Sequence, residues 1–247
     1  MDDKRKGIYI LPNLFTTAAL FSGFYAIVQA MNGHFQNASI AIFIAMVMDG
    51  LDGRVARWTH TESDFGAQYD SLSDMVSFGL APALVAYEWS LSSFGNLGWL
   101  IAFLYAAAAA LRLARFNSQT HVDRRLSFHG LPSPSAAALV AGLVWMSRSF
   151  SLSGPGMSVI TLVITVLAAA AMVSNIRYQS FKRFDLKGRV PFVAILAIVL
   201  TFVLVSLNPP RVLFLMFLAY AASGPVTAVV RRHRRVREKR AMDSKRV

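Results

Sequence analysis

The sequence predicts an all-α protein, a polytopic membrane helix bundle of about eight transmembrane helices, and three observations lead to this prediction. Hydrophobic residues make up 55% of the 247 residues and charged residues only 15%, a composition typical of membrane proteins. Apolar stretches of about the length that a bilayer requires recur along the whole chain. Lys and Arg gather in alternate connections between these stretches, which is the charge pattern of membrane topology.

Each apolar stretch predicts one membrane helix, because the connections between the stretches are polar or rich in turn-forming residues. The approximate bounds are 8–31, 36–56, 68–89, 97–116, 133–150, 157–175, 190–207 and 210–230. The first stretch is long for a signal-peptide core and is not followed by a small-x-small cleavage site, so we expect it to be retained as a helix. Asn208, Pro209 and Pro210 predict a turn before the last helix.

The 25 Lys and Arg residues predict which side of the membrane each connection faces. Of these, 23 fall on one side, together with both termini, and only Arg148 and Arg211 fall on the other. The positive-inside rule makes the rich side cytoplasmic, which requires an even number of helices and agrees with eight. We therefore predict a transmembrane domain at 1–230 and a basic cytoplasmic tail at 231–247 that contacts anionic lipid.

Composition also excludes several classes of function. The net charge of +12 would suit a nucleic-acid partner, but the cations flank apolar spans, and no zinc-finger, RNA-recognition or helix-turn-helix pattern is present. The sequence thus predicts membrane lipids and no nucleic acid as partners. The chain has no cysteine, and its five histidines lack the spacing of metal ligands, so neither a disulfide framework nor a zinc site is predicted.

Four aspartates form a regular pattern at the predicted cytoplasmic ends of the second and third helices. The full pattern is Asp49-x-x-Asp52-Gly53-x-x-Ala56-Arg57, eight further residues, then Gly66-x-x-x-Asp70-x-x-x-Asp74. Residues three or four apart share a helix face, and the polar segment between the two halves predicts a short turn. We therefore expect the acidic faces to meet across a helix hairpin.

Converging carboxylates require a cation. One carboxylate at membrane depth costs at least ~2.5 kcal/mol, and several together repel one another. Oxygen-only ligation suits hard divalent ions such as Mg²⁺, Mn²⁺ or Ca²⁺. The predicted ligands are Asp49, Asp52 and Asp70, with Asp74 ligating in part.

Small residues accompany the acidic pattern. Gly53, Ala56 and Gly66 leave room for a bulky ligand, and the guanidinium of Arg57 suits phosphate. Cations, small residues and an arginine together predict a pyrophosphate site. Taken separately, an Asp-x-x-Asp pair is more often a solvated helix cap, and Gly and Ala in membrane helices are more often packing contacts.

The complete pattern resembles the signature of the CDP-alcohol phosphotransferase family, D-x-x-D-G-x-x-A-R-x8-G-x3-D-x3-D, with no departure. Residues 11–16 (LPNLFT), 113–117 (LARFN) and 128–134 (FHGLPSP) are similar to the members of this family that use serine. The resemblance spans roughly residues 8–230. It implies a homodimeric enzyme of the bacterial cytoplasmic (inner) membrane that transfers the phosphatidyl group of CDP-diacylglycerol to L-serine, giving phosphatidylserine and CMP.

The resemblance also implies roles for single residues. The family's last aspartate, here Asp74, is the general base, and the metal is Mg²⁺ or Mn²⁺. The residues implied to contact CDP are Asn13, Thr16, Asp49, Asp52, Gly53, Ala56, Arg57 and Gly66. From the sequence alone Asn13 is equally well explained as a helix-start cap.

For the acceptor, a carboxylate at the membrane edge calls for an arginine, which binds it through two parallel hydrogen bonds. Arg112 and Arg115 lie one turn apart at the cytoplasmic end of the fourth predicted helix, and we expect one of them to bind serine. Alternatively, both are positive-inside anchors. The turn at 130–134 could close the pocket.

Two other functions remain open. A sister enzyme would use glycerol phosphate, inositol phosphate or choline as acceptor. A transporter would also place carboxylates at membrane depth, but its charged residues would lie in several helices near the bilayer midplane.

Overall fold

The computed structural model describes residues 3–59, 61, 63–118, 130–176, 178 and 192–243, which contain helices and no strand. The elements are α1 (Asp3–Met31), α2 (Phe35–Thr59), α3 (Asp64–Asp74), the π-helix η1 (Met75–Leu80), α4 (Ala81–Trp89), the 3₁₀-helix η2 (Leu91–Phe94), α5 (Asn96–Ser118), α7 (Ser133–Ser149), α8 (Pro155–Val173), α9 (Phe192–Leu207) and α10 (Pro209–Asp243). Because α3, η1 and α4 follow without a break, they form one rod. Each predicted apolar stretch corresponds to one rod, so the all-α prediction is confirmed.

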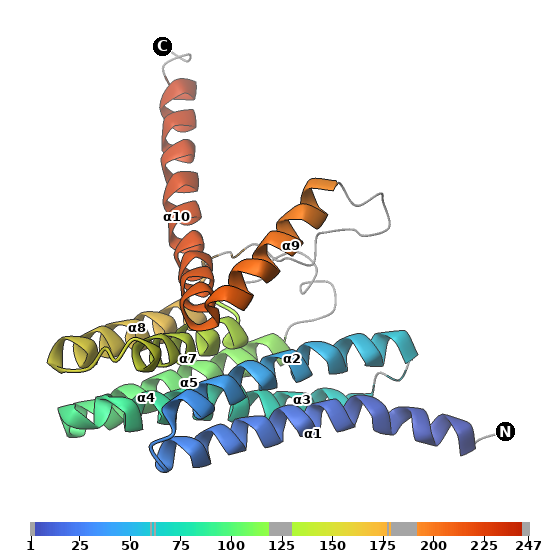
Figure 1. Cartoon of the computed structure of the whole chain (residues 1–247). Coiled ribbons are helices and arrows are strands. Elements are labelled where there is room, and N and C mark those ends of the chain that lie inside the picture. Colours follow the sequence, from blue (N-terminus) through green and yellow to red (C-terminus); the bar gives the residue numbers. More distant parts are fainter. Residues whose placement is uncertain are drawn as a thin grey trace.

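The helices from α1 to α8 lie roughly side by side in one bundle, and α9 and α10 rise from it at a steep angle (Figure 1). The end of α2 and the start of α3 lie at the same end of the bundle as the start of α1 (Figure 1). α10 packs across α7, and α1 packs along α2. This arrangement brings three helices to one end of the bundle, where the acidic pattern lies.

The core consists of two clusters of buried side chains that share α7. One cluster joins α4, α5, α7 and α8, and the other joins α1, α2, η1, α4 and α7. Alanines dominate the second cluster, among them Ala26 and Ala30 on α1 and Ala41 and Ala45 on α2. Small side chains let membrane helices approach closely, and van der Waals packing then holds them together.

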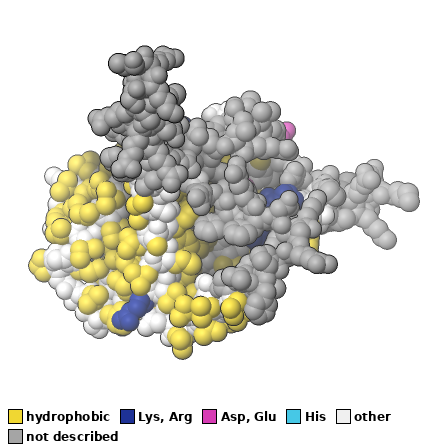
Figure 2. All heavy atoms as spheres, turned by 90° about the horizontal axis from the view of Figure 1, so that it is seen from above, with side chains coloured by type: hydrophobic (Ala, Val, Ile, Leu, Met, Phe, Trp, Pro, Cys, Tyr) yellow, Lys and Arg dark blue, Asp and Glu magenta, His cyan; other side chains and the backbone are white. Residues whose placement is uncertain are grey.

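The outer surface of the bundle is apolar. Figure 2 shows hydrophobic side chains over most of the described part of the face that it views. Large apolar side chains such as Phe21 on α1, Phe103 on α5 and Leu167 on α8 are exposed. Four stretches are long and apolar enough to cross a membrane, namely Leu11–Met31, Asn96–Ser118, Pro155–Val173 and Pro209–Ala228. The protein is therefore a polytopic membrane helix bundle.

Length or polar residues explain why the remaining helices are not identified as membrane spans by their length and hydropathy. α7 and α9 have only 17 and 16 residues, and α2 carries Asp49, Asp52, Arg54 and Arg57 in its C-terminal half. In the third rod, the polar residues of α3 precede the apolar residues of η1 and α4. The eight-span topology thus stays a prediction.

The start of α1 differs from the prediction, and the predicted domain boundary falls inside a helix. α1 begins at Asp3 rather than near residue 8, so Pro12 lies inside the helix and Asn13 does not cap its start. α10 runs to Asp243 in one piece, so the predicted boundary between 1–230 and 231–247 lies within a helix. Because a helix can continue from the bilayer into water without a break, hydropathy alone does not mark its end. The division into a membrane domain and a basic tail stays a prediction.

We expect reporter fusions to place residue 34 outside the cytoplasm and residue 247 inside it, because 23 of 25 Lys and Arg favour that orientation. Residue 34 lies in the tight turn between α1 and α2, where Gly33 has φ = +74° and His34 is exposed, so an inserted reporter disturbs little packing. The measurement is the activity of a periplasm-specific and a cytoplasm-specific reporter at each position. Finding both positions on one side would contradict the topology.

Candidate active site

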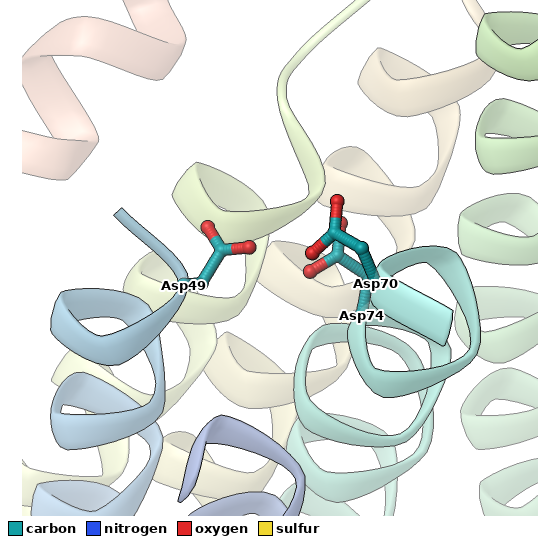
Figure 3. Close-up of side chains that lie close together, drawn as sticks. All are labelled: Asp49, Asp70 and Asp74. Atoms are coloured by element: carbon teal, nitrogen blue, oxygen red, sulfur yellow. The ribbon is translucent and has the colours of Figure 1, made fainter. Parts of the chain in front are cut away.

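Three of the four aspartates meet at one end of the bundle. Asp49 on α2 faces Asp70 and Asp74 on α3 (Figure 3). One carboxylate oxygen from each lies within 4.8 Å of the others, and all three residues are partly buried. Asp70 and Asp74 are four residues apart, so they stack on one face of α3 as the spacing predicts. The structure thus brings together a group that could hold a metal ion.

Asp52 lies outside this group of three. Its side chain is buried, with only 5% of its surface exposed, and the hydroxyl of Thr16 on α1 donates a hydrogen bond to its Oδ2 at 2.7 Å. Its carboxylate is still close enough to that of Asp70 for the two to repel. Asp52 therefore contributes negative charge to the site and ties α2 to α1. The family resemblance implies that Thr16 contacts CDP, and in the structure its hydroxyl donates a hydrogen bond to this aspartate.

Serine side chains hold the acidic face of α3 in place against α1. The Ser73 hydroxyl donates to the Thr16 carbonyl oxygen at 3.1 Å, and the Ser77 hydroxyl donates to the Ala19 carbonyl oxygen at 3.0 Å. Gly23 lies so close to Ser77 that a Cβ at position 23 would be 2.7 Å from the Ser77 Cα. The π-helix η1 begins directly after Asp74. π-Helical turns occur frequently at functional sites, because they change which residues face a neighbour.

The predicted small residues lie around the same end of the bundle. At Gly66 a Cβ would lie 3.6 Å from Oδ1 of Asn13, so α1 approaches the first turn of α3 closely here. At Gly53 a Cβ would meet the guanidinium of Arg57, whose Nη1 lies 3.5 Å away. Gly53, Gly66 and Ala56 are partly exposed, and Arg57 is exposed. The small residues at positions 53 and 66 let the Arg57 side chain and α1 come close to the helix ends that carry the carboxylates.

The two predicted acceptor arginines lie in different environments. Arg112 is partly buried, and its guanidinium interacts electrostatically with the Asp74 carboxylate and with the phenols of Tyr105 and Tyr220. Arg115 is exposed. Arg112 is therefore partly buried and within electrostatic range of the acidic group, whereas Arg115 is exposed.

Sequence reasoning missed three contacts at this site. The Arg112 Nη1 donates to the Ser133 hydroxyl at 2.8 Å, Tyr220 approaches from α10, and Thr16 bonds Asp52. In the predicted turn at 130–134, Gly130 has φ = +83° and packs against the Met172 carbonyl oxygen. Residues 128 and 129 of the FHGLPSP stretch lie outside the described part of the chain. The only sequence signal for Ser133 was its place in that stretch.

The charge of the site favours a cation. Two unit charges 4.8 Å apart repel by about 3.5 kcal/mol at an effective dielectric constant of about 20. A hard divalent ion removes this repulsion, and three carboxylates supply oxygen ligands of the kind that such ions prefer. The donor set of Asp49, Asp70 and Asp74 thus fits a divalent metal.

The fold and the site together define an integral membrane protein with a candidate metal centre at one end of its helix bundle. The centre is a group of three carboxylates, and a partly buried arginine lies nearby. The chain belongs to the CDP-alcohol phosphatidyltransferase family, whose pattern matches residues 9–176. The match includes the acidic pattern, both arginines and Ser133, and it ends before α9 and α10.

Several known proteins are similar in sequence to most of the chain. A CDP-diacylglycerol–serine O-phosphatidyltransferase of Helicobacter pylori is 40% identical over 176 residues, covering 71% of this chain and 74% of the relative. A protein of the same name from Methanocaldococcus jannaschii is 34% identical over 188 residues, covering 76% and 82%. An archaetidylserine synthase of Methanothermobacter thermautotrophicus is 34% identical over 181 residues, covering 72% and 73%.

Proposed function

We propose that the protein transfers the phosphatidyl group of CDP-diacylglycerol to L-serine and releases phosphatidylserine and CMP. The observation that carries the proposal is the three-carboxylate group of Asp49, Asp70 and Asp74, with Arg112 within electrostatic range of Asp74. The names of the similar proteins support the serine acceptor. The clustering of the carboxylates at one end of the bundle favours an enzyme over a transporter, whose charged groups would lie near the midplane of several helices.

The proposed cofactor is Mg²⁺ or Mn²⁺, held by Asp49, Asp70 and Asp74 with Asp52 nearby. When bound, such an ion neutralises negative charge on the pyrophosphate and on the leaving CMP. Asn13, Thr16, Gly53, Ala56, Arg57 and Gly66 form the proposed CDP site around it. The exposed guanidinium of Arg57, which lies beside Gly53, suits a phosphate contact there.

Asp74 is the proposed general base, and the acceptor attacks directly. The serine hydroxyl gives its proton to the Asp74 carboxylate, and its oxygen bonds to the phosphorus that carries the diacylglycerol. The bond between that phosphorus and the oxygen of CMP breaks, and CMP leaves. A direct attack is favoured because the chain has no cysteine and its sequence shows no evident Ser-His pair that would form a covalent intermediate.

We further propose that Arg112 binds the serine carboxylate, because it is partly buried within electrostatic range of Asp74 while Arg115 is exposed. A bound carboxylate would then hold the serine hydroxyl next to the base. The proposed setting is the bacterial inner membrane, with both termini cytoplasmic and the protein a homodimer. A cytoplasmic site gives serine access from water, while the acyl chains of CDP-diacylglycerol stay in the bilayer.

The decisive experiment incubates purified protein with CDP-diacylglycerol, Mg²⁺ or Mn²⁺, and one acceptor at a time. The acceptors are L-serine, glycerol 3-phosphate, inositol phosphate and choline, and mass spectrometry identifies each lipid product. We expect phosphatidylserine with L-serine and little product with the others. A preference for another acceptor would make the protein a sister enzyme, and no product with any acceptor would contradict the proposed reaction.

Substituting Arg112→Lys should raise the KM for serine about tenfold or more, while the KM for CDP-diacylglycerol changes little. Lysine keeps the charge but loses the planar group that forms two parallel hydrogen bonds with a carboxylate, each worth about 1.5 kcal/mol or more. The measurement is a pair of saturation curves, one for each substrate. Arg115→Lys is the matched control, since Arg115 lies one turn away and is exposed. An unchanged serine KM in Arg112→Lys would show that the carboxylate binds elsewhere.

A further inference from the structure

The guanidinium of Arg112 is held from one direction. Its Nη1 donates to the Ser133 hydroxyl at 2.8 Å, whereas its Nε–H is buried and has no hydrogen-bond partner among the described residues. Nε–H and the neighbouring Nη2–H lie on the same edge of a guanidinium, and that edge takes a carboxylate through two parallel hydrogen bonds. Ser133 therefore binds Arg112 without occupying its Nε.

Ser133 is well placed to fix this orientation. It is the first residue of α7 and is fully buried, so its hydroxyl cannot turn to water. The preceding turn is held by the Leu131 amide, which donates to the Ala171 carbonyl oxygen at 2.9 Å. A rigid α7 start thus presents one acceptor oxygen to Arg112 on α5.

A second residue near Arg112 comes from α10. Tyr220 is partly buried and lies within electrostatic range of the Arg112 guanidinium. Its ring packs against that of Tyr178, with centroids 5.7 Å apart, and the Tyr178 hydroxyl donates to the Ala221 carbonyl oxygen at 3.1 Å. Gly224, one turn further along α10, has no side chain where the Tyr178 ring lies. Tyr178 thus fixes α10 so that Tyr220 reaches the site.

We propose that Ser133 and Tyr220 are positioning residues for the acceptor, holding Arg112 so that its Nε edge receives the acceptor carboxylate beside Asp74. This inference rests on the proposed transfer to serine. α10 lies outside residues 9–176, the part of the chain that matches the family. Under this proposal the helix helps to hold the acceptor in place.

The test is the effect of Ser133→Ala and Tyr220→Phe on the two KM values. We expect Ser133→Ala to raise the serine KM about tenfold, the effect of one lost hydrogen bond to a charged group, with the KM for CDP-diacylglycerol unchanged. Tyr220→Phe should shift the serine KM in the same direction by a smaller factor. A merely structural role would lower the amount of active enzyme without separating the two KM values.

A control variant makes the result specific. Ser147→Ala removes another fully buried serine of α7, whose hydroxyl donates within its own helix to the Leu143 carbonyl oxygen. It should keep the wild-type serine KM. If Ser133→Ala does not fold, Tyr220→Phe still decides, since it changes a single hydroxyl on a partly buried ring.

The outcomes separate this inference from the proposed function. Wild-type protein that makes no phosphatidylserine would overturn both. Wild-type protein that makes phosphatidylserine, with unchanged serine KM in Ser133→Ala and in Tyr220→Phe, would overturn the positioning role alone. Equal increases in both KM values would also overturn it.

Discussion

Replacing Asp74 by asparagine is expected to reduce turnover by about 10²- to 10⁴-fold, the usual cost of losing a general base. Asparagine has nearly the same shape as aspartate but cannot take the proton of the serine hydroxyl. Asp74 is the last residue of α3 and faces both Asp49 and Arg112. A base in this place lies between the metal group and the arginine proposed to hold the acceptor.

The measurement is kcat at saturating serine together with the affinity for CDP in the presence of Mg²⁺. Because Asp74 also belongs to the three-carboxylate group, the CDP affinity shows whether the metal site survives the substitution. We expect CDP binding to be largely kept while turnover collapses. Asp64→Asn is the matched control, since Asp64 lies in the first turn of the same helix and is exposed. Near-normal turnover in Asp74→Asn would show that the base lies elsewhere.

Removing divalent cations is expected to abolish turnover, and adding Mg²⁺ or Mn²⁺ should restore it. Without a cation, Asp49, Asp70 and Asp74 repel one another at separations below 4.8 Å, and the pyrophosphate of the substrate would add further negative charge. The experiment treats the protein with EDTA, removes the chelator and titrates each metal while phosphatidylserine formation is followed. Full turnover in EDTA would rule out a metal-dependent reaction.

The metal ligands are tested by binding rather than by rate alone. Asp49→Ala and Asp70→Ala should each remove the metal-dependent part of CDP binding, because each deletes one of the three oxygen ligands. Calorimetric titration of CDP with and without Mg²⁺ measures that part directly. Asp64→Ala, an exposed aspartate of α3 outside the group, should bind CDP as the wild type does. Metal-dependent CDP binding that persists in both Asp49→Ala and Asp70→Ala would place the metal elsewhere.

The sequence by itself determined the helices and the composition of the site. Apolar stretches of membrane length predict helices because the backbone must satisfy its hydrogen bonds locally in lipid, so hydropathy alone locates each rod in the described part of the chain. The four-residue spacing likewise determines that Asp70 and Asp74 stack, because positions four apart differ by only about 40° around a helix. The sequence also shows directly which positions beside the acidic pattern carry glycine or alanine.

Other features were decided by the tertiary structure. Positions three apart on a helix differ by about 60°, which is enough for neighbouring helices to separate them. Asp49 joins Asp70 and Asp74 across the hairpin, while Asp52 turns to Thr16 on α1. In the same way Arg112 turns inward and Arg115 outward. Periodicity fixes angles within one helix but not the rotation of that helix against its neighbours, which depends on packing.

The contacts of Arg112 show the same limit over a longer range. Ser133 and Tyr220 lie on different helices from Arg112, 21 and 108 positions along the chain, and no local pattern links them. They meet because α7 packs at the centre of the bundle and α10 crosses it. The residue types that the reaction needs were thus visible in the sequence. Which of them face one another was decided by helix packing, since side chains on separate helices become neighbours only when the bundle forms.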